Sequence, residues 1–328
     1  LILWIVGLIA LFHVVFAFVL FHIIVKPVKS LSKTSLELKK GNLEARATVK
    51  QVDEIGQLGN AFNSMADSLQ SKITTLEKFN EMMNVELKIA SDVQKTIYPQ
   101  LESTPQLEFS LYSKAFGEVS GDYYDVFPLS DDRTGILILD VSGHGVPAAL
   151  VTMVVKQEFR RHAPRIDDPA DLFRKINKNL FDMLRLQRTN PVYFTAFYLI
   201  IDKNRSITFC NAGHPEQILV RTRQKKITML NTNGFIVGIS KDMDEMYETS
   251  RTQLESGDKI VLFTDGITEA KDRASEEEYG EERMLSVVKE AYLKPGEVIK
   301  ERIMENLAEF SDMDNLADDT TLLIIEVK

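Results

Sequence analysis

Four aspartates stand where predicted strands begin or end, and together they have the chemistry of a metal site. Asp140 closes the apolar run GILILD and Asp265 closes KIVLFTD, whereas Asp122 precedes YYDVF and Asp318 precedes TTLLIIEV. Antiparallel neighbours bring the end of one strand beside the start of the next, so these side chains can share one edge of a sheet. Each aspartate alone is also an ordinary turn or cap residue, and both interpretations stay open at this point.

A shared edge would set several carboxylates against one another, and such repulsion raises carboxyl pKa values. A hard divalent cation relieves the repulsion. An all-oxygen set of ligands favours Mg²⁺ or Mn²⁺ over Zn²⁺. The pattern therefore predicts Mn²⁺ or Mg²⁺ as the cofactor if the aspartates converge.

The elements that must position these aspartates follow from the hydropathy pattern beyond residue 107. Several apolar strands are joined by short turns, as in IIDKNRSI, which favours antiparallel pairing. We expect an α+β fold, an antiparallel β-sandwich flanked by helices in α-β-β-α layers. The predicted strands are 109–116, 123–129, 135–141, 193–202, 206–212, 216–221, 225–230, 259–265 and 320–327, and the predicted helices are 146–161, 169–185, 282–291 and 296–310.

The beginning of the chain predicts a membrane span. Residues 1–25 contain no Asp, Glu, Lys or Arg, and this apolar length exceeds the ~20 residues that cross a bilayer. The sequence begins without Met, so we expect a fragment that lacks an earlier span or sensor. A basic flank follows the span and indicates its cytoplasmic side, although the same charges would suit contact with anionic lipid. The flank contains Lys26, Lys29, Lys33, Lys39, Lys40, Arg46 and Lys50.

Residues 26–70 resemble a HAMP domain, the relay module of bacterial receptors. Pro27 follows the span, where it can break or redirect a helix. The connector GNLEAR and the motif DEIG, which starts at Asp53, carry the resemblance, and Asp53 is predicted to cap the second helix. Each short amphipathic helix needs a partner for its apolar stripe, so the resemblance implies a homodimeric four-helix bundle.

Residues 71–99 predict a coiled-coil linker helix that Pro99 ends. Its seam alternates three- and four-residue steps, and polar Asn80 and Gln94 within it are typical of a paired helix held in register. We expect a homodimer through the HAMP domain and this coiled coil. The seam positions are Ile73, Leu76, Asn80, Met83, Leu87, Ala90, Gln94 and Ile97.

Residues 107–328 resemble the PPM family of metal-dependent protein phosphatases, in its bacterial SpoIIE-like branch. Five motifs carry the resemblance in order along the chain: GDYYD, DVSGHG, NAGHP, FTDGITEA and DDTTLL. The resemblance implies two metal ions bridged by a water whose lowered pKa yields the attacking hydroxide.

The roles of individual residues follow from the same resemblance. Asp140 is the expected bridging ligand, Asp265 and Asp318 are expected on the second metal, and the Val141 carbonyl on the first. Asp122 is an expected acidic ligand, direct or through water. Asp125 and Asp319 are secondary candidates. His144 and His214 are interpreted mainly as turn residues, with a general-acid role for His144 as the alternative.

The whole pattern predicts a signal-regulated serine/threonine protein phosphatase at the cell inner membrane, with its HAMP and catalytic domains in the cytoplasm. The resemblance implies a phosphorylated STAS-type anti-sigma-factor antagonist as substrate. The alternative is a degenerate phosphatase-like binding module that relays a HAMP signal. A net charge of −9 argues against nucleic acid as a partner.

Overall fold

The computed structural model describes residues 2–48, 52–130, 132–184, 192–313 and 316–328. The chain divides into two compact units, Leu1–Glu86 and Leu87–Lys328. The first unit is helical, and the second is a β-sandwich with flanking helices.

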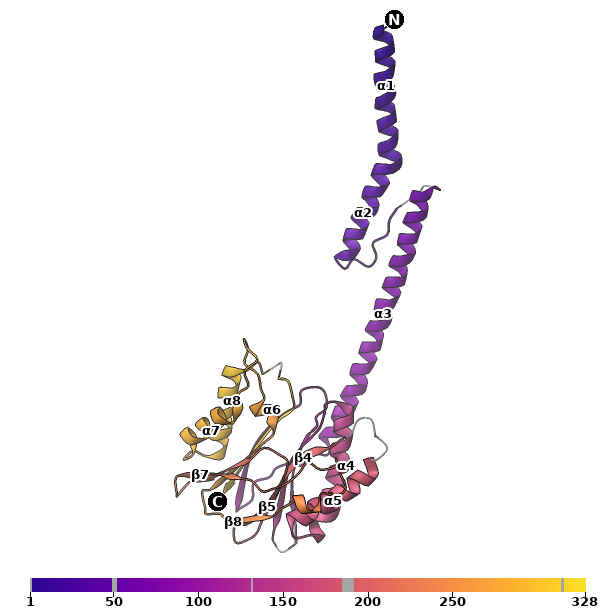
Figure 1. The fold of residues 1–328 in the computed structure, drawn as a ribbon. Helices are drawn as coiled ribbons and strands as arrows, with labels where there is room; N and C mark the ends of the chain where they lie inside the picture. Colours follow the sequence, from indigo (N-terminus) through magenta and orange to yellow (C-terminus); the bar gives the residue numbers. More distant parts are fainter. Residues whose placement is uncertain (1, 49–51, 131, 185–191, 314–315) are drawn as a thin grey trace. The chain divides into compact units, whose positions relative to one another are not determined.

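The first unit opens with an uninterrupted helical run (Figure 1). Helix α1, Ile2–Leu20, passes through a π-helical turn, Phe21–Val25, into α2, Lys26–Lys39. Pro27 therefore does not break the helix, which was one of the two effects that a proline at this place can have. Pro27 stands in the first turn of α2, where a missing N–H costs little, and the wider π-helical turn directly precedes it. The run Ile2–Lys39 is long and apolar enough to cross a membrane, by length and composition.

A connector links α2 to α3 and lies along α3. Gly41, with φ +95°, ends α2. The main chain of Ala47 exchanges two hydrogen bonds with the Asn63 side chain, at 2.8 and 3.0 Å. Asp53 Oδ1 accepts hydrogen bonds from the amides of Ile55 and Gly56, both at 3.1 Å, which confirms the predicted cap.

Helix α3, Glu54–Lys95, is one helix of 42 residues. The predicted second HAMP helix and the predicted linker helix are thus continuous. The helix ends earlier than the seam predicts, because Ile97 already lies in a turn before Pro99.

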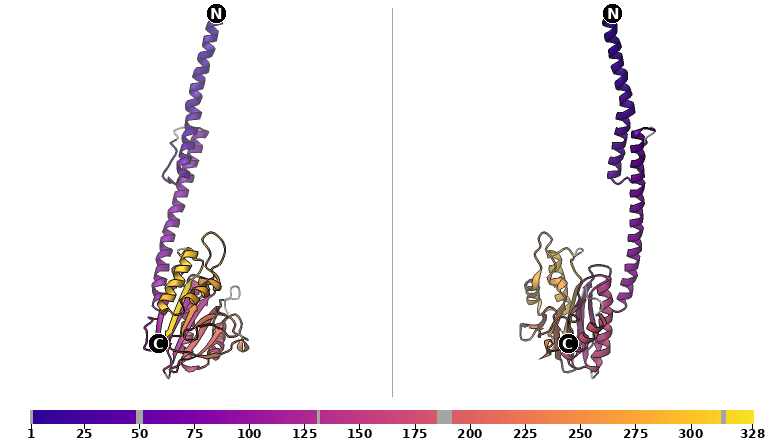
Figure 2. Two further views of the ribbon diagram at one scale, coloured as in Figure 1. Left: turned by 90° about the vertical axis from the view of Figure 1, so that its left-hand side faces the viewer. Right: turned by 45° about the vertical axis from the view of Figure 1, so that its right-hand side comes forward.

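The second unit confirms the expected α-β-β-α layers (Figure 2). One five-stranded sheet has the order β1-β10-β9-β6-β7 and the other has the order β2-β3-β4-β5-β8, with every pair antiparallel. The strands are β1 Leu107–Lys114, β2 Asp122–Pro128, β3 Thr134–Val141, β4 Phe194–Ile201, β5 Ser206–Ala212, β6 Gln217–Arg221, β7 Lys226–Leu230, β8 Ser250–Gln253, β9 Lys259–Phe263 and β10 Thr320–Val327.

Three apolar cores hold these layers together. Helices α4, Val146–His162, and α5, Pro169–Leu184, cover the β2–β8 sheet. Helices α7, Gly280–Ala291, and α8, Gly296–Phe310, cover the other sheet. Between the sheets, side chains such as Ile138, Phe197, Leu262 and Leu323 are fully buried. Each large buried side chain contributes roughly 1.5–3 kcal/mol, so the core between the sheets is a major source of stability.

Several short elements within the described residues were not predicted, including the 3₁₀ turns Ala163–Arg165 and Asp244–Met246. Strand β8 is the polar segment SRTQ at a sheet edge, and α6, Asp265–Thr268, is a single helical turn directly after β9. Strand β9 therefore ends at Phe263, two residues before the end of the predicted strand 259–265. Arg185, the predicted last residue of helix 169–185, lies outside the described residues.

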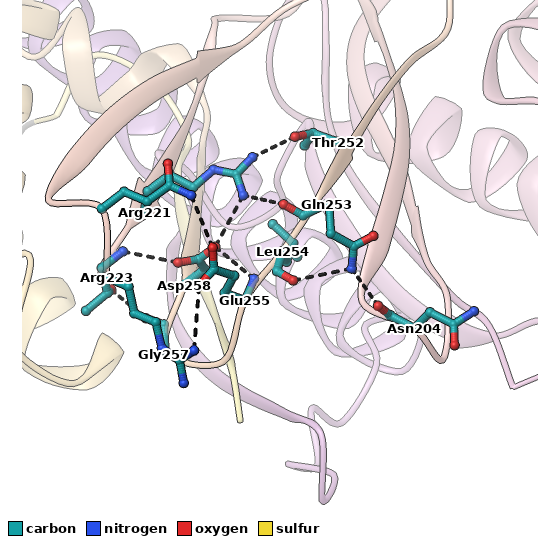
Figure 3. A network of polar contacts seen from close by, with 11 residues as sticks. Asn204, Arg221, Arg223, Thr252, Gln253, Leu254, Glu255, Gly257 and Asp258 are labelled. Atoms are coloured by element: carbon teal, nitrogen blue, oxygen red, sulfur yellow. Dashed lines mark hydrogen bonds and ion pairs between the residues drawn. The ribbon is translucent and has the colours of Figure 1, made fainter.

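A polar network fixes the crossover from β8 to β9 (Figure 3). The Arg221 guanidinium of β6 donates to Thr252 Oγ1 of β8 at 2.6 Å, which ties one sheet to the other. The buried carboxylate of Asp258 accepts from the amides of Thr222, at 3.1 Å, and Glu255, at 3.0 Å. This network sets the start of β9, the strand that leads to Asp265.

Candidate metal centre

The strand register brings Asp122 and Asp140 together. They are direct partners in the β2–β3 pair. Side chains alternate along a strand, and Ile138 and Ile136 of β3 belong to the core between the sheets, so Asp140 faces the same side. Asp122, opposite it, shares that face.

The facing sheet brings the other two aspartates to the same edge. Thr264 follows β9 and Thr321 lies in β10, and both hydroxyls donate to Asp122 Oδ2, at 2.8 and 2.7 Å. Asp265 directly follows Thr264. Gly266 lies so close to the Asp319 carbonyl that an added Cβ would be 1.9 Å from its oxygen. Only glycine permits this approach of the FTDG segment to the segment of Asp318.

Asp122 is buried, and its two carboxylate oxygens have different surroundings. Oδ2 accepts the two threonine hydroxyls, whereas Oδ1 has no hydrogen-bond partner within the described residues. Burial raises the pKa of Asp122 well above its ordinary value, and the charge of Asp140 raises it further. A buried, unsatisfied carboxylate oxygen is costly unless a cation or proton compensates it.

The electrostatics show that Asp140 has the other carboxylates as neighbours. Burial raises the pKa of Asp140 to about 8, and the charges of Asp265 and Asp318 contribute next. The pKa values of Asp265 and Asp318 are also raised, chiefly by burial. Asp122, Asp140, Asp265 and Asp318 thus lie near one edge of the sandwich, and their sharing of one metal site there remains a prediction.

These residues fit a hard divalent cation. The donors are carboxylate oxygens, and the unsatisfied Asp122 Oδ1 lies among them. Over the described ranges, no three His, Cys, Asp or Glu side chains already stand at metal-ligand spacing, so the carboxylates are gathered but not in ligating positions. Val141 follows Asp140 at this edge, and its amide donates to the Gly121 carbonyl at 3.3 Å. The ligand roles of the four aspartates and of the Val141 carbonyl remain predictions.

The two secondary candidates have different surroundings. Asp319 accepts main-chain amides on both oxygens, from Phe116 at 2.7 Å and from Gly121 at 2.6 Å, so it holds the loop before β2. Asp125 lies on the opposite face of β2 and accepts two hydrogen bonds from the Arg160 guanidinium, at 2.8 and 2.6 Å. Asp125 is therefore an ion-pair residue away from the cluster.

Residues at the end of α3 support Asp122, which sequence reasoning did not foresee. Gln94 Oε1 accepts from the Ser120 amide at 2.9 Å, and Gln94 Nε2 donates to the Ser120 carbonyl at 2.6 Å. The Tyr98 hydroxyl donates to the Asp122 carbonyl at 2.7 Å. The placement of Gln94 in a coiled-coil seam is therefore wrong. A heptad count cannot distinguish a partner helix from the surface of the helix's own domain.

Three further side chains complete the surroundings. His144 is exposed and lies edge-on to the Phe116 ring, with centroids 6.0 Å apart. Glu269, four residues after Asp265, has a raised pKa, first through burial and then through the Asp265 charge. His214 lies in the connection between β5 and β6, and it is buried and bonded to Thr195. The motifs FTDGITEA and NAGHP contained both residues without indicating these contacts.

The fold and the cluster define an α-β-β-α protein with an acidic site suited to divalent metal. The model of the family called Stage II sporulation protein E (SpoIIE) matches residues 130–328, and that of the HAMP domain matches residues 19–71. The chain belongs to the SpoIIE family.

Relatives and solved structures agree with this membership. Phosphoserine phosphatase RsbU of Bacillus subtilis is 28% identical over 265 residues, which cover 77% of this chain and 73% of the relative. Phosphoserine phosphatase RsbP of the same organism is 28% identical over 244 residues, which cover 74% of this chain but 58% of that protein. The SiaA-PP2C domain of Pseudomonas aeruginosa has the same fold, with a TM-score of 0.64 and 22% identity over 76% of this chain and 98% of that one.

Proposed function

We propose that this chain is a metal-dependent serine/threonine protein phosphatase. The observation that carries the proposal is the gathering of Asp122, Asp140, Asp265 and Asp318 at one edge of the sandwich, with Asp122 Oδ1 buried and unsatisfied. Two relatives over most of this chain are phosphoserine phosphatases by name. Family membership, the acidic donors and these relatives support the same activity.

Two Mn²⁺ or Mg²⁺ ions are the proposed cofactors. Asp140 would bridge them, Asp265 and Asp318 would hold the second, and the Val141 carbonyl would contribute at the first. Asp122 would be a further acidic ligand, direct or through water. When bound, such ions lower the pKa of a coordinated water and polarise phosphate oxygens. The protein's own part is to hold the carboxylates rigidly, as the Thr264 and Thr321 hydroxyls hold Asp122.

The proposed substrate is a phosphoserine or phosphothreonine of a STAS-type anti-sigma-factor antagonist. The wider proposal is a protein in the cell inner membrane, with the HAMP and catalytic domains in the cytoplasm and homodimeric through the HAMP domain and α3. The apolar run Ile2–Lys39 and the HAMP match support the membrane anchor. The proposed domain limits are 1–25, 26–70, 71–99 and 107–328.

A non-catalytic binding module is the second candidate. Loss of a central aspartate would be its signature, and all four are present, so an active enzyme is the better supported reading.

Substrate class is tested by comparing phosphate release from a phosphoserine-containing STAS protein and from a phosphotyrosine peptide, with Mn²⁺, using the full chain in detergent. We expect faster turnover of the phosphoserine protein. Faster turnover of the phosphotyrosine peptide contradicts the proposed substrate class. No phosphate release from either substrate contradicts the proposed phosphatase activity.

A further inference from the structure

The motif NAGHP builds a buried histidine site beside the carboxylates. The Asn211 side chain grips the main chain of His214, accepting from its amide at 2.7 Å and donating to its carbonyl at 2.8 Å. Gly213 has φ +72°, and an added Cβ would lie 2.7 Å from Ile236 Cγ2. The motif therefore fixes the position of His214 through its main chain, which leaves the imidazole for another purpose.

One hydrogen-bond partner of the imidazole adjoins the cluster. His214 Nδ1 is 2.8 Å from Thr195 Oγ1. Thr195 on β4 is the direct register partner of Asp140 on β3, just as Asp122 is on the other side. Directly opposed residues share a face with Cβ atoms about 4.5–5.5 Å apart. Asp122, Asp140 and Thr195 thus form one row across three strands, and His214 extends it.

The rest of the His214 ring is enclosed. His214 is 5% exposed, and the main chain of Phe263 is a further polar neighbour of the ring, although Nε2 forms no hydrogen bond of full geometry within the described residues. Burial lowers the pKa of His214 to about 3, so the ring is neutral and does not repel cations at the neighbouring edge.

We propose that His214 is a positioning residue for Asp140: its imidazole fixes the hydroxyl of Thr195, and Thr195 fixes the orientation of the Asp140 carboxylate. The inference rests on the proposed function, in which Asp140 is the bridging metal ligand. Partners of this kind set the geometry of a ligand without touching the metal, and their loss typically weakens metal binding by about 10–100-fold.

The test measures Mn²⁺ binding from the electron paramagnetic resonance signal of free Mn²⁺, with the full chain in detergent. Thr195→Val and His214→Leu remove the hydrogen bond. Thr195→Ser keeps the hydroxyl, and His214→Asn keeps a polar atom near the Nδ1 position. Thr208→Val, on β5 of the same sheet, and His162→Leu, at the end of α4, are matched controls. Unfolding midpoints without metal report on folding.

We expect Thr195→Val and His214→Leu each to weaken Mn²⁺ binding by about 10–100-fold. The double variant should bind Mn²⁺ as well as the weaker-binding of the two single variants, because both substitutions remove the same hydrogen bond. Thr195→Ser, His214→Asn and both controls should stay within about threefold of wild type. In turnover, the Mn²⁺ requirement should rise more than kcat falls.

Unchanged Mn²⁺ binding in folded Thr195→Val overturns the proposal. So do additive losses of Mn²⁺ affinity in the double variant, or losses of Mn²⁺ affinity in the two controls equal to those in Thr195→Val and His214→Leu. If His214→Leu does not fold, the difference in Mn²⁺ affinity between Thr195→Val and Thr195→Ser decides whether the hydroxyl of Thr195 matters. Binding is measured without substrate, so a wild-type chain that binds Mn²⁺ but hydrolyses nothing would contradict the phosphatase and leave this inference standing.

Discussion

Asp122 and Asp140 lie opposite each other at the ends of their strands, with Asp265 and Asp318 arriving from the facing sheet. All four pKa values are raised, chiefly because burial disfavours the charged form, and neighbouring carboxylates add to the rise for Asp122, Asp140 and Asp318. Without metal, the fold therefore holds these carboxylates at a cost in stability. Binding of the proposed divalent metal would remove that cost.

The pH dependence of stability should reveal the repulsion. The folded pKa of Asp140, about 8, exceeds the ordinary value of about 3.9 in an unfolded chain, so the native state binds more protons between these values. The stability that protonation confers is complete below the unfolded pKa and lost as the pH rises through the folded one. We expect metal-free protein to lose stability from about pH 4 to 8.

Asp140→Asn tests whether Asp140 causes this fall in stability with rising pH. The variant should be more stable than the wild type at pH 8 without metal, on the order of 1–2 kcal/mol, and should show a flatter pH profile. Thermal unfolding in a chelator measures both. A wild-type profile that rises steadily from pH 4 to 8 would be inconsistent with a repulsive cluster.

The Arg160–Asp125 pair predicts a different result. Removing Arg160 leaves the fully buried Asp125 carboxylate without its two guanidinium bonds, which costs about 3–5 kcal/mol for a buried pair. Because Arg160 is itself 38% exposed, the lower end is expected. Arg160→Met should therefore lower the unfolding midpoint and leave Mn²⁺ affinity unchanged. A large loss of Mn²⁺ affinity in the folded variant would indicate that Asp125 contributes to the metal site after all.

At the level of single residues, the sequence predicted which aspartates gather but not what holds them. Strand ends are visible in hydropathy, so Asp122 and Asp140 were identifiable. The hydroxyls of Thr264 and Thr321 come from distant segments, and contacts across two sheets leave no periodic signal in one chain. His214 was equally hidden, because its partner Thr195 is nineteen residues away.

Secondary structure elements were predicted where apolar patterning was strong. Strand β5 was placed with its observed bounds, Ser206–Ala212, and helix α8 likewise, Gly296–Phe310. Strand β8 was missed because SRTQ contains no apolar residue and only the edge pairing with β5 makes it a strand. The continuity of helix through Pro27 depends on a local π-helical turn that propensity does not predict.

Helix α3 supplies a test of its own. Gln94→Leu leaves the Ser120 amide and carbonyl without their partner and should cost about 2 kcal/mol, roughly 4–8 °C in Tm. Asn80→Leu on the same helix is the control. Asn80 is exposed, and in a paired seam leucine would stabilise rather than destabilise. Equal losses in both variants would mean that Gln94 has no special contact.

For the molecule as a whole, we expect the unbroken α3 to carry a HAMP signal as a rotation or a change of register of the helix. A seven-residue insertion near Asn80 keeps the seam aligned, with a drift of about 20° for a straight helix, whereas three or four residues displace it by half a heptad. We expect the seven-residue insertion to retain stimulus-dependent activity and the shorter one to lock activity on or off. Equal regulation in both, measured in membranes, would make the helix a passive spacer.

The decisive measurement for metal-dependent phosphatase activity is phosphate release from a phosphoserine protein as a function of Mn²⁺ concentration, for wild type, Asp140→Asn and Asp265→Asn. We expect no release without metal, saturable release with Mn²⁺ in the wild type, and a loss of more than about 100-fold in both folded variants, beyond the effect of removing an outer partner. Turnover like that of wild type in either variant, or release that a chelator does not change, would show that these aspartates do not hold a catalytic metal.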